Sequence, residues 1–194
     1  MKKIIGLTGG IGSGKSIVSR LLETMNIPVY NTDIEAKRIM HESPIIKEKL
    51  INLFGNTLYS KGVLDRQKLS SLIFSDKENL NYVNGIVHPE VGKDFQEWVD
   101  RQENEELVAI ESAILFESGF DKMVDVTVSV TASIDIRIER VIKRDGTKKD
   151  LVLNRIKNQM SEEERNKKSN YVIINNETEA LIPQVEYLVK TFYS

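Results

Sequence analysis

The sequence predicts an α/β fold of three layers, with helices on both faces of a five-stranded parallel sheet. Five short apolar segments have the character of buried strands, at residues 2–8, 27–33, 106–117, 125–132 and 171–176. Residues 2–33 run strand, helix, strand, which is the order of a parallel βαβ unit. A block with helical periodicity separates the second strand from the third.

Each helix is expected from apolar residues that recur every three to four positions. The first begins at Ser16, directly after a glycine-rich loop, and the second follows Asp33. Glycine, serine and proline divide the helical block into segments at residues 45–55, 65–75, 76–88 and 89–102. Further helices at residues 134–146, 148–168 and 179–193 complete the prediction.

The composition is typical of a globular protein without a strong overall field. The net charge is −2, so nothing draws the whole molecule onto nucleic acid or anionic lipid. The chain has no cysteine, which excludes disulfides and thiolate metal sites. The apolar run in MKKIIGLTGG is too short for a signal peptide, and none approaches the roughly 20 residues of a membrane span. We expect a cytoplasmic protein, a monomer or weak homo-oligomer, that binds neither nucleic acid nor membrane.

The stretch GLTGGIGSGKS, residues 6–16, has the pattern G-x-x-x-x-G-K-[ST] between a predicted strand and a predicted helix. In that context backbone N–H groups and a helix N-terminus bind the phosphates of a nucleoside triphosphate. Lys15 would reach the β- and γ-phosphates, and the Ser16 hydroxyl would coordinate Mg²⁺. We therefore expect a P-loop nucleotide-binding fold. The expected nucleotide contacts are Gly9, Gly10, Ile11, Gly12, Ser13, Gly14, Lys15, Ser16 and Ile17.

Three classes of protein use such a loop. TKKD at 147–150 resembles the guanine-reading motif of switch GTPases, but it lies in a charged helical region, and no Asp has a Gly three positions later. Mechanical ATPases usually need a longer chain and an acidic pair at a strand end. Here LVAIE ends in the single acid Glu111, which can hold Mg²⁺ through water. A small kinase remains, in which the helical block is the acceptor site.

A kinase needs a lid that excludes water. RIERVIKRDG supplies Arg137, Arg140, Lys143 and Arg144 before a glycine hinge, and arginines can neutralise a phosphoryl group in transfer. The same helix also fits a solvated face, because Glu139 can pair with Lys143. The expected nucleotide-binding core comprises residues 1–38 and 103–194, with a lid at about 140–166. The expected acceptor-binding insertion comprises residues 39–102.

Asp33 is the candidate base. It follows the second strand, at the carboxyl edge where α/β sheets place their chemistry, so it could accept the proton of an attacking hydroxyl. An aspartate at this point is also a common N-cap for the helix that follows. Position alone does not choose between the two roles.

Several segments together resemble the dephospho-CoA kinases, over nearly the whole chain. GLTGGIGSGKS is similar to the N-terminal segment of that family. GVLDRQKLSSLIF at 62–74 is similar to its G-x-L-d-R-x-x-L-x-x-x-v-F segment. VHPEV at 87–91 resembles the family's His-Pro motif, and ILFESG resembles its P-L-L-F-E segment. RIERVIKRDG, together with RIKNQ, resembles its lid and the helix that follows. The resemblance implies a fold like that of nucleoside monophosphate kinases. It also implies Mg²⁺- and ATP-dependent phosphorylation of the ribose 3′-hydroxyl of 3′-dephospho-CoA, giving CoA and ADP.

The resemblance also implies roles for single residues. Asp33 would be the catalytic base, while Lys15 and Arg140 would stabilise the moving phosphoryl group. Thr8 matches the family's threonine just ahead of the loop, and Thr8 and Arg144 would contact the nucleotide. Arg66, His88 and Glu117 match positions on the acceptor side, although a His-Pro pair also fits a packing role. The alternatives are a related kinase of a nucleoside or nucleotide, and a nucleotide-binding switch protein.

The chain departs from the family pattern at four of these positions. The family's D-A-D reads NTD, so Asn31 replaces an aspartate, and Ala113 replaces the proline of P-L-L-F-E. Arg137 stands where the family has a lid glutamine, and Asn170 where it has an aspartate near the last strand. Lys15, Ser16, Asp33 and Arg140 all match, which favours an active enzyme.

Overall fold

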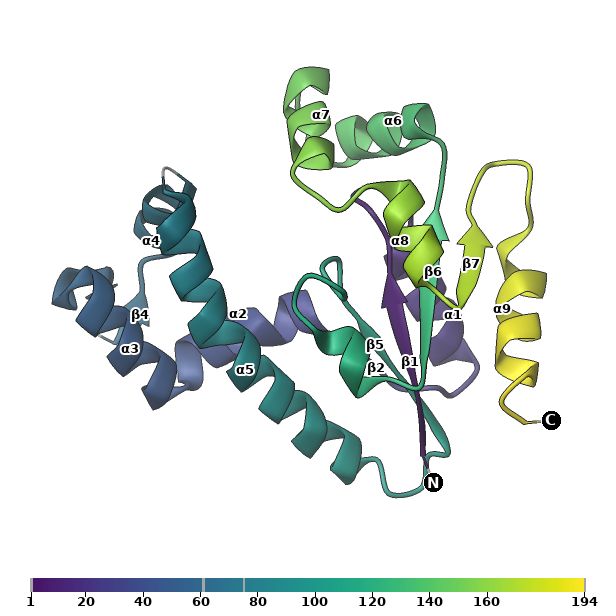
Figure 1. The fold of residues 1–194 in the computed structure, drawn as a ribbon, viewed down its shortest axis with the longest axis horizontal. Coiled ribbons are helices and arrows are strands. Elements are labelled where there is room, and N and C mark those ends of the chain that lie inside the picture. The colour runs from purple at the N-terminus through teal and green to yellow at the C-terminus, as the bar shows by residue number, and fades with distance from the viewer. Residues whose placement is uncertain (1, 61, 75, 194) are drawn as a thin grey trace. The chain divides into compact units, whose positions relative to one another are not determined.

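The computed structural model describes residues 2–60, 62–74 and 76–193. The chain divides into two compact units, Met1–Asn31 with Glu103–Ser194, and Thr32–Gln102. The first, here called the sheet unit, carries the parallel sheet, and the second, here called the helical unit, is built mainly from helices (Figure 1).

The sheet unit contains a five-stranded parallel sheet in the order β2-β5-β1-β6-β7, which confirms the predicted fold class. Its strands are β1 (Lys3–Thr8), β2 (Val29–Asn31), β5 (Leu107–Glu111), β6 (Val126–Thr131) and β7 (Tyr171–Ile174). Most residues of the central strands β1, β5 and β6 are buried, as expected for a parallel sheet covered on both faces. The third strand ends at Glu111, earlier than predicted, and turns follow it.

Helices α1 (Lys15–Thr24) and α9 (Leu181–Lys190) cover one face of the sheet. Their buried residues form one core with Ile5, Leu7 and other strand residues that point to the same side. Gly6 points to the opposite side, where a Cβ atom would lie 2.9 Å from Leu115 and 2.9 Å from Val124. The segment with the short helix η2 (Phe120–Met123) and helix α8 (Glu162–Lys168) covers that second face. The sheet unit therefore has three layers.

Two charged helices, α6 (Ile134–Asp145) and α7 (Lys149–Lys157), precede α8 in the sheet unit (Figure 1). The prediction of one helix over residues 148–168 is wrong, because the chain forms α7 and α8 separately. Ser161 starts the second helix, and its hydroxyl accepts a hydrogen bond from the Glu164 N–H at 3.2 Å. A serine in this position is a strong N-cap, and this capping signal explains the break.

The helical unit contains α2 (Thr32–Glu42), α3 (Pro44–Phe54), α4 (Arg66–Phe74) and the long helix α5 (Lys77–Arg101). Helices α2, α3 and α4 each contact α5. The predicted break at Pro89 is wrong, because α5 continues through this proline. A proline inside a helix removes one backbone hydrogen bond and crowds the carbonyl of the residue four positions earlier, which here is Gly85.

The helical unit also holds a short helix, η1 (Asn56–Leu58), and a two-stranded antiparallel hairpin, β3 (Tyr59–Ser60) with β4 (Val63–Leu64). This hairpin was not predicted, because strands of two residues show no alternation in the sequence. None of the helices in the described part of the chain has the length and apolar character needed to cross a lipid bilayer.

Candidate active site

The glycine-rich loop follows the carboxyl end of β1 and leads into α1, as predicted. Gly12 and Gly14 have φ angles of +79° and +95°, which L-residues with side chains rarely adopt. A Cβ atom on Gly14 would lie 2.0 Å from the side-chain nitrogen of Asn175, and one on Gly9 would lie 2.4 Å from the carbonyl oxygen of Val130. The loop therefore requires glycine for both conformation and space.

Side chains from outside the loop hold its tip at Ile11. The Ile11 N–H donates to Gln159 Oε1 at 2.9 Å, and the Ile11 carbonyl accepts from Arg137 Nε at 3.0 Å. The Ile11 side chain packs against a small apolar cluster of α6 and α7 that includes Ile138 and Val152. Both polar backbone groups of Ile11 and its side chain are thus engaged by the α6–α8 segment.

Arg137 is a support of the loop rather than an exposed lid cation. It is only 4% exposed, and its Nη1 forms an ion pair with Glu162 Oε2 at 2.7 Å. Glu162 also accepts a hydrogen bond from the Thr131 hydroxyl. A Cβ atom on Gly10 would lie 2.2 Å from Arg137 Nη2, so the loop backbone packs directly on the guanidinium. The grouping of Arg137 with the lid cations is wrong, since its donors point into the protein.

The other end of the loop is held from β7. Asn175, which is 5% exposed, donates from Nδ2 to the carbonyl oxygen of Ser13 at 2.7 Å. Lys15 bends back over the loop, and its Nζ donates to the Gly9 carbonyl at 2.8 Å. The loop is therefore preformed, and the ammonium group of Lys15 lies along it.

The residues of the loop fit a bound phosphate chain. The first turn of α1 contains no acidic residue, and the N-cap residue is Gly14, which has no side chain to occupy the helix N-terminus. Within the residues that the structure describes, the buried hydroxyls of Thr8 and Ser13 have no hydrogen-bond partner. A helix N-terminus without an acidic side chain favours an anion.

Glu111 lies at the carboxyl end of β5, where Mg²⁺ would accompany the phosphates. Its Oε2 accepts from the Ser19 hydroxyl at 2.7 Å and from Asn31 Nδ2 at 3.1 Å. Ser19 follows Ser16 by one helical turn, so Glu111 is one turn from the predicted metal ligand. No group of three or more His, Cys, Asp or Glu residues is arranged as a metal site in the described ranges. Mg²⁺ beside phosphates needs only one or two protein ligands with water, so these residues fit it.

Asn31 and Asn170, two of the departures from the family pattern, both have definite partners. The Asn31 amide donates to Glu111, whereas an aspartate there would set two carboxylates against each other. Asn170 Oδ1 accepts from the N–H of Thr127 at 2.8 Å and from its hydroxyl at 2.9 Å. An aspartate oxygen can accept the same bonds, which explains why the two residue types can exchange at this position.

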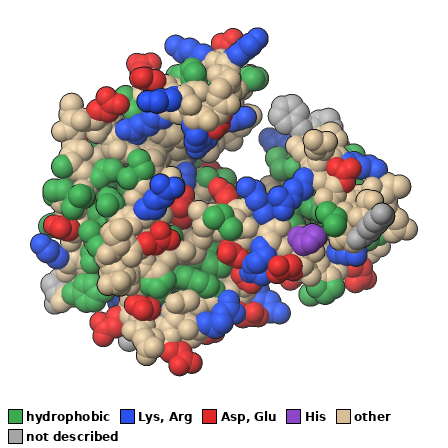
Figure 2. Space-filling model, turned by 180° about the vertical axis from the view of Figure 1, so that it is seen from behind, with side chains coloured by type: hydrophobic (Ala, Val, Ile, Leu, Met, Phe, Trp, Pro, Cys, Tyr) green, Lys and Arg blue, Asp and Glu red, His purple; other side chains and the backbone are tan. Residues whose placement is uncertain are grey.

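The remaining cations of α6 differ in their surroundings. Arg140 is partly buried, and its Nη1 is a buried donor without a hydrogen-bond partner among residues 2–60, 62–74 and 76–193. Arg144 is exposed and pairs with Asp145 at 2.7 Å, which raises the pKa of Arg144 and lowers that of Asp145. Figure 2 shows Lys and Arg side chains over α6 and α7, at the top of the sheet unit.

Glu117 lies in the sheet unit, close to the start of α8. Its Oε1 accepts from the N–H of Met160 at 3.3 Å. The neighbouring Arg165 is 1% exposed and donates from Nη2 to the Met160 carbonyl at 2.6 Å. Burial lowers the pKa of Arg165, and the charge of Glu117 partly offsets that effect. Glu117 therefore helps to fix the segment that carries Gln159 and Glu162.

The helical unit contains Asp33, Arg66 and His88. Asp33 is exposed and is the second residue of α2, so it lies in the first helical turn rather than before it. Arg66 is exposed at the first position of α4. His88 is partly buried in α5, and burial lowers the pKa of its ring.

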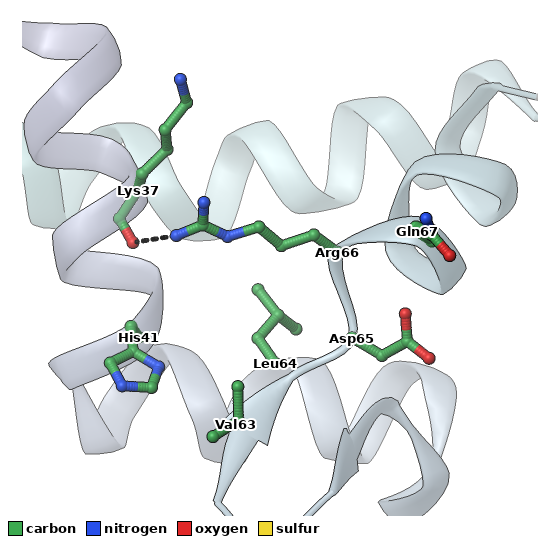
Figure 3. Close-up of a pocket in the computed structure, with 7 residues that line it drawn as sticks. All are labelled: Lys37, His41, Val63, Leu64, Asp65, Arg66 and Gln67. Carbon is green, nitrogen blue, oxygen red and sulfur yellow. Dashed lines mark hydrogen bonds between the residues drawn. The ribbon is translucent and has the colours of Figure 1, made fainter.

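Arg66 borders a pocket of about 430 Å³ within the helical unit (Figure 3). Its lining residues come from α2, β4 and the start of α4: Lys37, His41, Val63, Leu64, Asp65, Arg66 and Gln67. The guanidinium of Arg66 reaches toward α2, where Nη2 donates to the Lys37 carbonyl at 3.5 Å. Arg66 lies in a recognisable sequence segment and was predicted, whereas Lys37 and His41 carry no motif and were not.

Comparison with known proteins decides the family. The model of the dephospho-CoA kinase family matches residues 3–180. The chain belongs to the dephospho-CoA kinase family. It is 42% identical over 189 residues to the dephospho-CoA kinase of Bacteroides fragilis (strain YCH46), covering 97% of this chain and 92% of that protein. The match to the dephospho-CoA kinase of Porphyromonas gingivalis is 44% identical over 188 residues, 96% of this chain and 93% of that protein.

Solved structures agree with this membership. The chain superposes on a crystal structure of a Thermus thermophilus protein with a TM-score of 0.84 and 36% identity, covering 99% and 96% of the two chains. A dephospho-CoA kinase from Campylobacter jejuni has a TM-score of 0.71 at 22% identity, with 98% and 96% coverage. Shikimate kinase from Bacteroides thetaiotaomicron has a TM-score of 0.55 at 14% identity, with 99% of both chains covered. The last two share the fold, which agrees with the predicted α/β architecture of three layers.

Proposed function

We propose that this family member transfers the γ-phosphoryl group of ATP to the 3′-hydroxyl of the ribose of 3′-dephospho-CoA. The products are CoA and ADP, and the reaction is the final step of CoA biosynthesis. The observation that carries the proposal is the family match over residues 3–180, together with a preformed phosphate loop between β1 and α1. ATP and the acceptor are both small molecules, so neither nucleic acid nor membrane takes part, and the enzyme works in the cytoplasm as a monomer or weak homo-oligomer.

The sheet unit holds ATP and Mg²⁺. Backbone N–H groups from Gly9 to Ser16 surround the phosphates, and Thr8 and Ile17 flank them. Ser16 would hold Mg²⁺ directly and Glu111 would hold it through water, and the bound ion would neutralise charge on the phosphates. Arg140 directs its buried donor to the phosphoryl group, and Arg144 contacts the nucleotide from the same helix.

The helical unit holds the acceptor. Asp33 orients the ribose 3′-hydroxyl and accepts its proton, while the hydroxyl oxygen bonds to the γ-phosphorus and the bond to the β–γ bridging oxygen breaks. The division of the chain at Asn31–Thr32 supports placing Asp33 with the acceptor, slightly before the boundary that the sequence suggests. Arg66 and His88 belong to the same unit, and Glu117, which lies in the sheet unit, is the third residue that we assign to the acceptor.

A lid at about residues 140–166 closes over the transferring group. Its hydrogen bonds and apolar contacts to Ile11 couple this segment to the loop. Closure excludes water, so ATP reacts with the ribose hydroxyl rather than being hydrolysed.

The test is the identity of the product. The purified chain is incubated with Mg·ATP and 3′-dephospho-CoA, and the product is separated and examined by mass spectrometry and ³¹P NMR. We expect a phosphate monoester on the 3′-oxygen of the ribose, and no product with Lys15→Ala. A phosphate at another position, or product only with adenosine or AMP as acceptor, would contradict the proposal.

A further inference from the structure

Helix α2 presents a row of polar residues on one face. Asp33, Lys37 and His41 are spaced by four residues, so they follow one another along the same side of the helix. With a rise of about 1.5 Å per residue, Lys37 and His41 lie roughly 6 Å and 12 Å along the helix from Asp33. The row leads from the proposed base into the pocket of Figure 3, which Lys37 and His41 border.

Asp33 belongs to the row itself, and three other carboxylates of α2 and α5 are held by Arg38. Arg38 binds Glu35 at 2.5 Å, Glu42 at 2.9 Å and both oxygens of Asp94 at 2.7 and 2.8 Å. These contacts raise the pKa of Arg38, Asp94 contributing most. Since one arginine binds these three carboxylates, they are not available to neutralise Lys37.

The pocket itself has an excess of cationic donors. In the part of the chain that the structure describes, the side chains of Lys37 and His41 have no hydrogen-bond or ion-pair partner, and Arg66 makes only the 3.5 Å contact to a carbonyl. The one carboxylate in the lining belongs to Asp65, and its Oδ1 accepts from the N–H of Lys68 at 2.9 Å as part of the α4 terminus. Lys37 and Arg66 therefore offer two positive charges to an anion in solution.

We infer that this pocket binds the 5′-diphosphate of the acceptor, with Lys37 and Arg66 as charge partners and His41 as a hydrogen-bond donor. The inference rests on the proposed function, and it adds the part of the substrate that these residues recognise. In 3′-dephospho-CoA the 5′-diphosphate is attached to the ribose that carries the reacting hydroxyl. A hydroxyl at Asp33 therefore places the diphosphate one to two helical turns away, where Lys37, His41 and Arg66 lie. Arginine and lysine are the residues that bind phosphate oxygens most strongly.

The first test uses the histidine rings as reporters. The chain has only two histidines, so the His41 ring signals can be assigned by comparing the ¹H–¹³C NMR spectrum of the intact chain with that of His41→Gln. The signals are followed during titration with 3′-dephospho-CoA, adenosine, inorganic pyrophosphate and ATP. We expect them to shift with dephospho-CoA and pyrophosphate, and not with adenosine. A larger response to ATP than to dephospho-CoA would overturn the assignment to the acceptor.

The second test removes the charges. Lys37→Gln and Arg66→Gln should each raise the dissociation constant of dephospho-CoA about fivefold, and the double variant should raise it at least tenfold, as expected for partly exposed charge pairs. The Michaelis constant for ATP should not change. Lys49→Gln is the matched control, because it removes one exposed lysine of the same unit outside the pocket. Its affinity for dephospho-CoA should equal that of the unaltered chain.

The outcomes separate this inference from the proposed function. If the chain makes CoA but the double variant binds dephospho-CoA as tightly as the Lys49→Gln control, the pocket assignment is wrong and the function stands. If the chain makes no CoA, the proposed function is wrong. In that case the pyrophosphate titration tests the anion site by itself. The site is retained only if pyrophosphate shifts the His41 signals of the intact chain and does not shift them in the double variant.

Discussion

Replacement of Arg137 by methionine tests how the phosphate loop is supported. Methionine keeps much of the length of the side chain but removes all its donors. The change breaks the ion pair with Glu162 at 2.7 Å and the hydrogen bond to the Ile11 carbonyl at 3.0 Å. Arg137 is 4% exposed, whereas the Glu162 side chain is 35% exposed, so the pair lies between the buried and the surface cases.

The expected loss of stability follows from the intermediate burial of this ion pair. Breaking a fully buried pair costs about 3–5 kcal/mol, and an exposed pair is worth less than about 1 kcal/mol, so we assign roughly 2 kcal/mol to this one. The bond to Ile11 adds about 1 kcal/mol. A total of about 3 kcal/mol should lower the unfolding midpoint of a chain of this length by roughly 6–12 °C.

The assay is thermal and urea unfolding of Arg137→Met beside Arg155→Met. Arg155 is also an ion-paired arginine, but its side chain is 53% exposed and pairs with Asp145 at 3.2 Å. The control variant Arg155→Met should have the same unfolding midpoint as the unaltered chain. In a double-mutant cycle with Glu162→Gln, the two losses should be less than additive by about 1–2 kcal/mol. Equal midpoints for the two arginine variants, or strict additivity in the cycle, would refute the reasoning.

The remaining predictions concern the loop, the base and the pH dependence. Asp33→Asn should retain ATP affinity but lose about 10²–10⁴-fold in turnover, measured by equilibrium binding and initial rates; unchanged turnover would leave Asp33 with a purely structural role in α2. Gly14→Ala should abolish tight ATP binding in calorimetry, because its Cβ would meet Asn175 at 2.0 Å, whereas Gly55→Ala, at a similar positive φ in open space, should not affect ATP. Burial lowers the pKa of His88, so the unfolded chain takes up the proton first and the free energy of unfolding should fall as the pH drops below about 6.5. Urea unfolding at pH 7.5 and 5.5 should show this decrease, and His88→Gln should reduce it; identical pH slopes would contradict the assignment.

The parallel sheet and the loop could be predicted because their signals are local. A strand of continuous apolar residues that stops at GGIGSGKS, followed by a helix-periodic segment, determines β1, the loop and α1 within about 20 positions. The helix boundaries were harder to predict. Pro89 lies inside α5, although a proline usually indicates a break, and the separation of α7 from α8 depends on the cap at Ser161.

The supports of the loop could not be predicted, because they are tertiary contacts. Arg137 is 126 positions from Ile11, and Gln159 is 148 positions away. In the sequence Arg137 is one of several cations on a charged helix, and only the fold shows that it points inward. The same is true of Lys37 and His41, which line the pocket because β4 and the start of α4 lie beside α2 in the fold.

The central claim is that the acceptor is 3′-dephospho-CoA. The measurement that tests it most directly is ADP release from Mg·ATP in a coupled assay, with 3′-dephospho-CoA, adenosine or AMP as acceptor and with no acceptor. The account predicts that dephospho-CoA raises the rate far above the others, and that Lys15→Ala abolishes the increase. A rate that is the same with and without dephospho-CoA, or that rises only with adenosine or AMP, would contradict it.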